Sequence, residues 1–420
     1  MPLCSRQWFW HTDEEPPKTI NGGAAPGRKS NVLSDNAVQV AVFGPKAPIV
    51  VQTFISDKTD ETHQDCIRDR MRANSMTRRH LPRREFLRTG VATTAAAIAS
   101  GGWANGELDA RIMTVTGAIS ANQLGVTLPH EHVLVDFVGA DKVSPERYDQ
   151  NEAFEVILPH LKRIRALGCQ SLAECTPAWL GRDPGLLLRL SEASGLQLLT
   201  NTGYYGASAG KFLPKHALTE DADSLARRWL AEWNDGIDGT NVRPGFIKIG
   251  VDGGPLTEVN RKLVQAAART HLKSGLVIAG HTGDGNAALE QLAILRQEGV
   301  DGSAWIWVHA QNEKDLAVPR QVAEQGAWVS LDGISPTSIE QHVEMVVNLK
   351  QAELLHRVLI SHDAGWYSVG EPHGGTYRGY ETLFAEFLPA LRKAGLTDAE
   401  IKLLTVTSPA KAFSIGIRTR

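Results

Sequence analysis

Two histidines separated by a single residue, His130 and His132, follow an apolar run of the chain. Side chains two residues apart on a β-strand lie on the same face, so these imidazoles would point in one direction. Two neutral imidazoles supply half of the ligands of a tetrahedral divalent metal ion, and the others can come from distant parts of the chain. By itself, a His-x-His pair more often consists of one packed and one exposed histidine, so a metal site needs support from other residues.

Short apolar runs with β-propensity alternate with longer helical patterns along the chain. This alternation predicts an α/β fold, a single-domain (β/α)8 TIM barrel of parallel strands. Continuous apolar stretches such as residues 358–360 suit strands buried on both faces. Asp183 and Pro184 have the character of a helix N-cap and first helical position, so the apolar residues after them are predicted to be helix. The eight runs are residues 125–130, 170–176, 197–204, 245–251, 276–281, 305–309, 327–332 and 357–363.

Residues that can bind metal lie at the ends of several of these runs. His281 ends the fifth run, His309 ends the sixth and Asp363 ends the eighth, whereas Lys248 lies within the fourth. The C-terminal ends of barrel strands face one shared mouth, so the pattern predicts that these side chains meet there. The histidines in predicted helices or loops are interpreted as surface or packing residues: His160, His216, His271, His342 and His356.

Lys248 needs a separate argument, because a lysine that points into a cation site repels the metal unless its charge is removed. Reaction with CO2 gives a carbamate, N6-carboxylysine, whose two oxygens can each hold one ion. Burial of an amine favours its uncharged, reactive form. The alternative is a lysine that extends out of the barrel toward solvent.

The combined pattern resembles the phosphotriesterase family of the amidohydrolase superfamily, which includes phosphotriesterase-related proteins and phosphotriesterase-like lactonases. The resemblance covers roughly residue 110 to the C-terminus. It also includes residues 180–183, 236–240 and 360–363, and the closing Thr407-Ser-Pro-Ala410. The residues that carry it are His130, His132, Lys248, His281, His309 and Asp363.

The resemblance implies two divalent metal ions, with Zn2+ expected. His130, His132 and Asp363 would hold the buried ion, His281 and His309 the more exposed one, and carboxylated Lys248 would bridge them. Two ions that share a hydroxide give a nucleophile at neutral pH, polarise a carbonyl or phosphoryl oxygen and stabilise the anion that forms. Asp363 would accept the proton of the hydroxide as general base.

The substrate class must come from residues around the mouth. Tyr205 matches a tyrosine that lactone-hydrolysing members of the family place over the metals, where organophosphate-hydrolysing members tend to have tryptophan. Gly333 differs from the arginine that lactonases usually carry after the aspartate. We therefore expect hydrolysis of lactones or carboxylic esters, with side activity on organophosphate triesters, and a true phosphotriesterase is the alternative. The residues expected to line the pocket are Trp179, Tyr205, Trp366, Tyr367 and His373.

Two other classes of function stay open. One is a deacetylase or nuclease of the same superfamily, although a barrel nuclease should have a basic mouth and a bridging acid in place of Lys248. The other is a non-catalytic metal-containing barrel that binds a hydrophobic small molecule. Turnover of any ester separates the last class from the hydrolases.

A segment before the barrel resembles a twin-arginine export signal. Arg83 and Arg84 are followed by Phe86 and Leu87, a modest apolar stretch and small residues. This stretch is too short to span a bilayer as a helix. We therefore expect recognition by the twin-arginine export machinery, a periplasmic or secreted location, and no membrane anchor in the mature protein.

This signal sets the expected organisation of the chain. Residues 76–104 are predicted to be the signal peptide and residues 105–420 the barrel. Residues 1–75 are predicted to be a mis-assigned or disordered extension, with Met71 or Met76 as the true start.

Charge and cysteine usage limit the partners. Beyond residue 104 the chain has 30 Lys and Arg against 37 Asp and Glu, a net charge of -7 that disfavours binding to nucleic acid. The expected partner is a small-molecule ester or lactone, and the family resemblance implies a homodimer. Cys169 and Cys175 are too far apart on an extended strand to form a disulfide.

Overall fold

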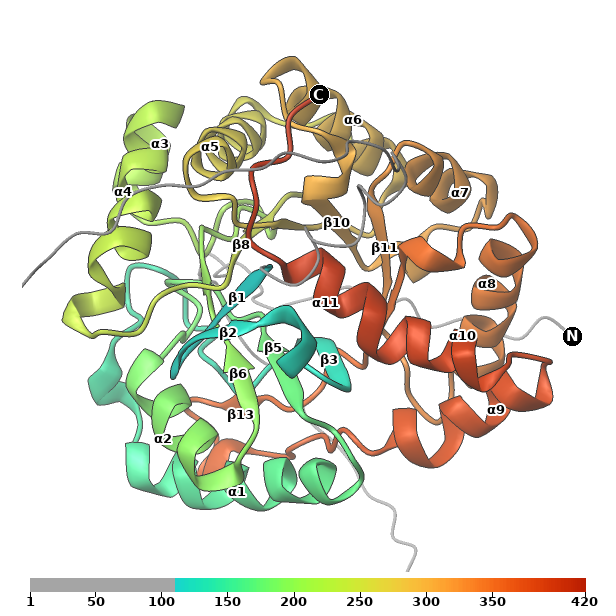
Figure 1. The fold of residues 1–420 in the computed structure, drawn as a ribbon. Helices are drawn as coiled ribbons and strands as arrows, with labels where there is room; N and C mark the ends of the chain where they lie inside the picture. The colour runs from blue at the N-terminus through green and yellow to red at the C-terminus, as the bar shows by residue number, and fades with distance from the viewer. Residues whose placement is uncertain (1–109) are drawn as a thin grey trace, which may run out of the picture. The chain divides into compact units, whose positions relative to one another are not determined.

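The computed structural model describes residues 110–420, which form the barrel in Figure 1. The predicted extension and signal peptide lie outside these residues and stay predictions. All eight predicted strands are present, so the predicted TIM barrel is confirmed. In chain order they are β3 (Thr127–Glu131), β5 (Ser171–Glu174), β6 (Gln197–Leu199) with β7 (Asn201–Thr202), β8 (Phe246–Gly250), β9 (Ile278–His281), β10 (Trp305–Val308), β11 (Trp328–Leu331) and β12 (Val358–Ile360).

Neighbouring barrel strands pair in parallel, in the order β3-β5-β6 and β7-β8-β9-β10-β11-β12. Strands β6 and β7 are two parts of the third predicted strand, interrupted at Thr200. The last strand returns to the first, because the main-chain N–H of His130 donates to Ser361 Oγ (3.1 Å) and that of Asp363 donates to the His130 carbonyl (3.2 Å). These bonds bring the ends of β3 and β12 together at the mouth.

Helices follow the strands and cover the outside of the barrel, as Figure 1 shows. Asp183 caps α2 by accepting from the Leu186 N–H (2.9 Å), and Pro184 is the first helical residue, as predicted. The main helices are α1 (Gln150–Ala166), α2 (Pro184–Ser194), α4 (Ala222–Asp235), α5 (Glu258–Ser274), α6 (Gly285–Gln297), α7 (Ala317–Glu324) and α8 (Ile339–Gln351). Shorter ones are α3 (Lys215–Thr219), α9 (Leu388–Lys393), α10 (Asp398–Lys402) and α11 (Ser408–Phe413).

An antiparallel hairpin that the sequence analysis did not predict packs with α11 at the end of the barrel opposite the mouth. Its strands are β1 (Arg111–Thr114) and β2 (Gly117–Ser120). Ile112 and Phe413 belong to the same buried cluster as Phe246, whose ring centroid lies 5.4 Å from that of Phe413. Because side chains alternate along a strand, Lys248 lies on the same inward face of β8 as Phe246.

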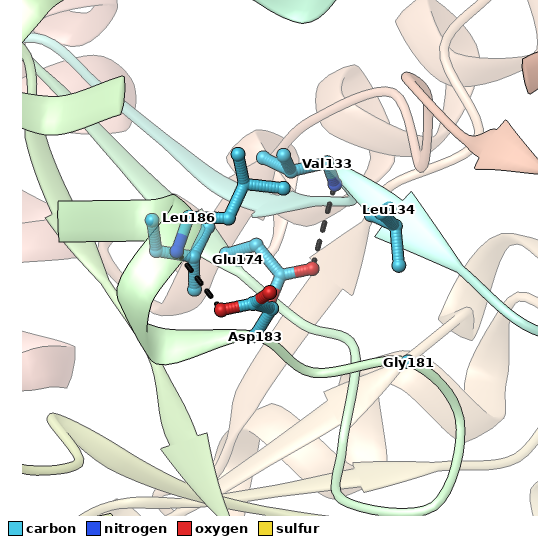
Figure 2. A pocket seen from close by; sticks show the side chains of 7 residues that line it. Val133, Leu134, Glu174, Gly181, Asp183 and Leu186 are labelled. Carbon is cyan, nitrogen blue, oxygen red and sulfur yellow. Dashed lines mark hydrogen bonds between the residues drawn. The ribbon is translucent and has the colours of Figure 1, made fainter. Parts of the chain in front are cut away.

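A small cavity of about 10 Å3, room for about one water molecule, lies beside β5 (Figure 2). Glu174 reaches it from the end of β5, and its Oε1 accepts from the main-chain N–H groups of Val133 (3.4 Å) and Thr176 (3.2 Å). Burial raises the pKa of Glu174 to about 7. Its other oxygen has no hydrogen bond to a described residue. The cavity is lined by Val133, Leu134, Glu174, Gly181, Asp183, Leu186 and Leu187.

Two further findings concern the described part of the chain. Within residues 110–420, no helix has both the length and the apolar character needed to cross a membrane. Cys169 and Cys175 are both buried and free, which confirms that they form no disulfide.

Candidate metal centre and active site

The ends of β3 and β12 bring three potential metal ligands together. Asp363 Oδ1 lies 3.1 Å from His132 Nε2 and 3.5 Å from His130 Nε2. Burial lowers the pKa of His130 to about 4 and also lowers the pKa of His132. Both imidazoles are therefore neutral at neutral pH, which is the form that binds a metal ion.

These three residues fit a cation. His130 Nε2 and Asp363 Oδ1 are buried and make no hydrogen bond within the described chain, an arrangement that is costly without a partner. The potential ligand atoms of His130, His132 and Asp363 all lie within 4.8 Å of one another. Two imidazoles and one carboxylate are a ligand set that suits zinc and similar ions.

Two more histidines lie next to this group, from β9 and β10. The ring centroids of His281 and His309 are 4.5 Å apart, and those of His309 and His130 are 5.1 Å apart. Burial and the neighbouring His309 hold the pKa of His281 well below its usual value. Lys248, 2% exposed, pairs in register with Ala279, two residues before His281 on β9. The structure thus brings the predicted histidines and aspartate together and buries the predicted lysine in the same barrel interior.

Comparisons with known proteins identify the family of this chain. The profile of the phosphotriesterase family matches residues 110–413. The chain belongs to the phosphotriesterase family. A phosphotriesterase homology protein of Escherichia coli is 31% identical over 299 residues, which cover 70% of this chain and 100% of that protein. An aryldialkylphosphatase of Saccharolobus solfataricus is 26% identical over 308 residues, covering 71% of this chain and 97% of that protein.

A solved structure extends the likeness to the fold. A variant of a phosphotriesterase-like lactonase from Deinococcus radiodurans has a TM-score of 0.65 and 29% sequence identity, and the match covers 72% of this chain and 100% of that chain. The predicted family is confirmed. As a member of the phosphotriesterase family, the chain is an ester-hydrolysing enzyme with residues that could bind metal.

The candidate site also includes a carboxylate that the sequence analysis did not single out. Asp332, at the end of β11, is fully buried and accepts from His309 Nδ1 (2.6 Å). Its Oδ2 lies 3.5 Å from His130 Nδ1. Burial opposes charge on both partners, but the Asp332 carboxylate raises the pKa of His309, and the two histidines hold the pKa of Asp332 below its usual value. Asp332 therefore orients one histidine from each predicted ion site, and it could also serve as a ligand with them.

The side chain of Gln311 gives a reason why the residue after Asp332 is a glycine. Its side chain donates from Nε2 to Asp332 Oδ1 (3.0 Å) and accepts from the Asp332 N–H (3.1 Å). A Cβ at Gly333 would lie 2.7 Å from Gln311 Nε2. The space that a side chain at position 333 would enter is thus filled by the amide that fixes Asp332.

Glu131, the middle residue of His-Glu-His, is a second buried carboxylate that was missed. Its Oε1 accepts from Ser361 Oγ (2.7 Å), His362 N (3.0 Å) and His362 Nδ1 (2.6 Å), and its Oε2 accepts from Ala364 N (2.9 Å). Asp363 stands between these donors with a left-handed φ of 55°, which few residues without special support adopt. Glu131 therefore holds the turn that presents Asp363 to the two histidines.

Thr176, just beyond β5, orients His132. Its Oγ1 lies 2.7 Å from His132 Nδ1 and donates to the Leu134 carbonyl (3.0 Å). Because the hydroxyl proton is used on Leu134, Thr176 accepts from the His132 Nδ1–H. This tautomer leaves the lone pair on His132 Nε2, the atom that faces Asp363.

Of the predicted pocket residues, Tyr205 and Trp366 lie beside the histidines. Tyr205 Oη is 2.8 Å from His281 Nε2, and burial raises the pKa of Tyr205, so the phenol keeps its proton. The Trp366 ring centroid lies 5.4 Å from that of His132. Gly250 leaves room for Tyr205, since a Cβ there would lie 2.5 Å from its ring.

The other three predicted pocket residues make their contacts elsewhere. Trp179, with a φ of 71°, has its ring centroid 6.3 Å from that of His216. Tyr367 is buried on β13 (Tyr367–Ser368) and pairs with Leu134 of β4 (Leu134–Val135). His373 is largely exposed, and its Nδ1 lies 2.6 Å from Glu152 Oε1 on α1.

Two phenylalanines that the sequence analysis missed complete a row of rings. Phe137 lies 5.3 Å from Trp366 and 6.1 Å from Phe212, and Phe212 lies 6.0 Å from Tyr205, all between centroids. We call these four residues, Trp366, Phe137, Phe212 and Tyr205, the aromatic wall. It runs from His132 of one predicted ion site to His281 of the other.

Proposed function

We propose that this protein is a binuclear-metal-dependent hydrolase of lactones or carboxylic esters, with side activity on organophosphate triesters. The observation that carries the proposal is the convergence of His130, His132 and Asp363 next to His281 and His309, with Tyr205 Oη on His281. Zinc is the proposed metal, and Lys248, buried on the inward face of β8, is the proposed site of carboxylation by CO2.

The protein's own groups have separate tasks in this proposal. When bound, the two ions supply a water nucleophile at neutral pH and polarise the carbonyl oxygen of the substrate. The Asp363 carboxylate accepts the proton of the attacking water, and the nearby His130 and His132 keep its pKa well below the usual value, so it starts ionised. Tyr205, which keeps its proton, donates to the ring or leaving oxygen of a lactone. The aromatic wall contacts the apolar part of the substrate.

A substrate panel tests the proposal. Lactones, aryl esters and organophosphate triesters are offered to purified protein whose metal content is measured. We expect about two ions per chain and a higher kcat/KM on a lactone or ester than on any phosphotriester. Metal-loaded protein without turnover of any ester would favour the binding-protein alternative instead. Mass spectrometry tests the proposed carboxylation of Lys248, which should increase the mass of the protein by that of one CO2 molecule.

Asp363→Asn separates metal binding from proton transfer. An amide can still offer an oxygen ligand but cannot accept the proton, so turnover should fall far more than metal content, by about 100-fold or more. If metal and activity fall together, Asp363 acts as a ligand only.

Phosphotriester hydrolysis is the second candidate, because the aryldialkylphosphatase relative carries that activity in its name. Tyr205→Trp distinguishes the two. Loss of the phenol should reduce lactone turnover by ~1 to 3 kcal/mol of transition-state stabilisation and affect phosphotriesters less. An unchanged ratio of the two activities would remove the argument from Tyr205.

We also propose export by the twin-arginine machinery to the periplasm or beyond. The support is the sequence around Arg83 and Arg84, which lie outside the described residues. Replacing both arginines with lysine should keep the enzyme in the cytoplasm, whereas deletion of residues 1–75 should leave export unchanged. Normal export of the double variant contradicts this route.

A further inference from the structure

Arg378 lies at the mouth, on the segment that follows β13. Its backbone is fixed by two hydrogen bonds with Gly365, each 2.9 Å. One guanidinium N–H donates to the main-chain carbonyl of Asp363, and the guanidinium carbon lies 4.6 Å from the Trp366 ring centroid. Arg378 is thus held against the aromatic wall, directly beside a predicted metal ligand.

The charge of Arg378 is not neutralised by the surrounding protein. Within residues 110–420, no carboxylate lies within ion-pair distance of its guanidinium, which is exposed. An arginine has five N–H donors in a planar fork, and the contact with the Asp363 carbonyl accounts for one. By contrast, Arg147 at the same end of the barrel is paired with Asp136 (2.6 Å). Arg378 therefore keeps donors available to an anion.

The aromatic wall carries a second cation. Lys211 Nζ lies 5.5 Å from the Phe212 ring centroid, and Lys211 is exposed. On the side of β11, Gly333 has no side chain and Gln311, which fills the space, is neutral. Two positive side chains, Arg378 and Lys211, therefore lie against the aromatic wall.

We propose that the preferred substrate is an ester or lactone with an apolar body and a carboxylate remote from the scissile bond, and that Arg378 binds this carboxylate. This inference rests on the proposed function. The planar fork of arginine matches a carboxylate with two parallel hydrogen bonds, and stacking on Trp366 presets its plane. The apolar body would then lie along Phe137, which is partly exposed next to Trp366.

A matched pair of esters tests the carboxylate. 4-Nitrophenyl hydrogen adipate and 4-nitrophenyl hexanoate share the leaving group and chain length and differ in the terminal carboxylate. The wild-type protein should prefer the adipate ester about five- to tenfold in kcat/KM, with the difference in KM, because a contact remote from the reacting atoms binds ground and transition states alike. Raising the salt concentration should reduce the preference.

Variants test whether the preference for the adipate ester depends on Arg378. Arg378→Gln should remove this preference, measured as the ratio of the two kcat/KM values within each protein, and Arg378→Lys should keep part of it. The control is Arg227→Gln, which replaces an exposed arginine on α4 that donates to Ser224 Oγ (2.8 Å) and should leave the preference unchanged. An equal preference in wild type and Arg378→Gln, or a wild-type preference for the hexanoate ester, overturns the inference.

A binding measurement keeps this test separate from the proposed function. Calorimetric titration of the metal-loaded protein with adipate and with hexanoate reports the same contact without turnover. Adipate should bind more tightly to wild type than to Arg378→Gln, whereas hexanoate should bind both alike. Protein that turns over neither ester refutes the proposed function, but a loss of adipate binding in the variant would still support the Arg378 contact. Equal adipate binding by the two proteins refutes that contact.

Discussion

The two halves of the centre are held in different ways. On the side of β3 and β12, Thr176 fixes His132 and Glu131 fixes the turn that carries Asp363, through buried groups. On the side of β9 and β10, Asp332 fixes His309, but His281 is bonded to Tyr205, a residue of the aromatic wall. We infer that the first half is a rigid metal site. In the second half, the position of His281 also depends on Tyr205, and therefore on a substrate that contacts the aromatic wall.

The largest expected effect comes from breaking the first half at Glu131. Glu131→Ala leaves four buried donors without an acceptor and removes the support for the left-handed turn at Asp363. Unfolding free energy should fall by ~3 to 5 kcal/mol, and metal should be lost from the protein that still folds. Urea unfolding and elemental analysis measure both.

Glu131→Gln is the matched control. It keeps one oxygen acceptor and the shape of the side chain, and its amide nitrogen faces the Ala364 donor, so the loss should be smaller. Equal stability of all three proteins would contradict the role given to Glu131.

A pair of changes compares the two halves directly. Asp332→Asn should weaken the binding of the ion near His309 about 10- to 100-fold, since loss of a group that orients a ligand histidine typically has that effect. The ion near His130 should be weakened less, because His130 Nδ1 lies 3.5 Å from Asp332 whereas His309 Nδ1 lies 2.6 Å from it. Thr176→Val should weaken the ion near His132 and leave the other in place. Stepwise metal titration with a chelator reports the order of loss. Loss of the same ion in both variants would show that the two halves are not independent.

Glu174 allows a further test of the first half, because its buried carboxylate accepts from the main-chain N–H groups of Val133, next to His132, and of Thr176. Its pKa of about 7 is above the unfolded value of 4.5, so the folded protein binds the proton more tightly. Stability from this group is complete below about pH 4.5 and is lost as the pH rises through about 7. Glu174→Gln keeps an oxygen for Val133 and Thr176 but has no proton to lose.

The variant should therefore gain stability relative to wild type as the pH rises, by ~1 to 3 kcal/mol above pH 7. Thermal unfolding at pH 5 and pH 8 measures this difference. A constant difference between the two proteins across that range contradicts the raised pKa.

The smallest effect is expected in the second half, at Gly333. Gly333→Ala places a Cβ against Gln311 Nε2, so the amide must move from Asp332 and unfolding free energy should fall by ~1 kcal/mol. In a Gln311→Ala background the same change should cost less. Gln341→Ala, which removes the hydrogen bond from Gln341 Nε2 to the Gln311 carbonyl (3.0 Å), is the control. If Gly333→Ala and Gln311→Ala lower the unfolding free energy additively, the cost of the alanine at position 333 does not come from contact with Gln311.

Sequence reasoning predicted the barrel because each strand is a local apolar run and the architecture brings all strand ends to one mouth. That is why His130, His281 and Asp363 could be grouped although they are far apart in the chain. The groups that support them could not be predicted in this way. The donors to Glu131 lie 230 or more residues later in the chain. The Gln311 amide occupies space that is free because residue 333 is glycine.

The rim was predicted less well than the strand ends, since loop conformation decides where a side chain points. Trp179 turns toward His216 from a left-handed position, and Phe137 reaches the mouth from a loop that has no periodic pattern. The hairpin of β1 and β2 was missed because its two short strands pair only with each other and end in an ordinary turn.

The hairpin beneath the barrel also bears on when this chain can finish folding during its synthesis. The Ile415 N–H donates to the Arg111 carbonyl (2.8 Å), and Phe413 packs against Phe246. The first described strand therefore waits for Phe413 and Ile415, which are synthesised after all eight barrel strands. Strands and helices between them can form as they emerge, but the end of the barrel opposite the mouth is completed only after residues 413–415 have left the ribosome.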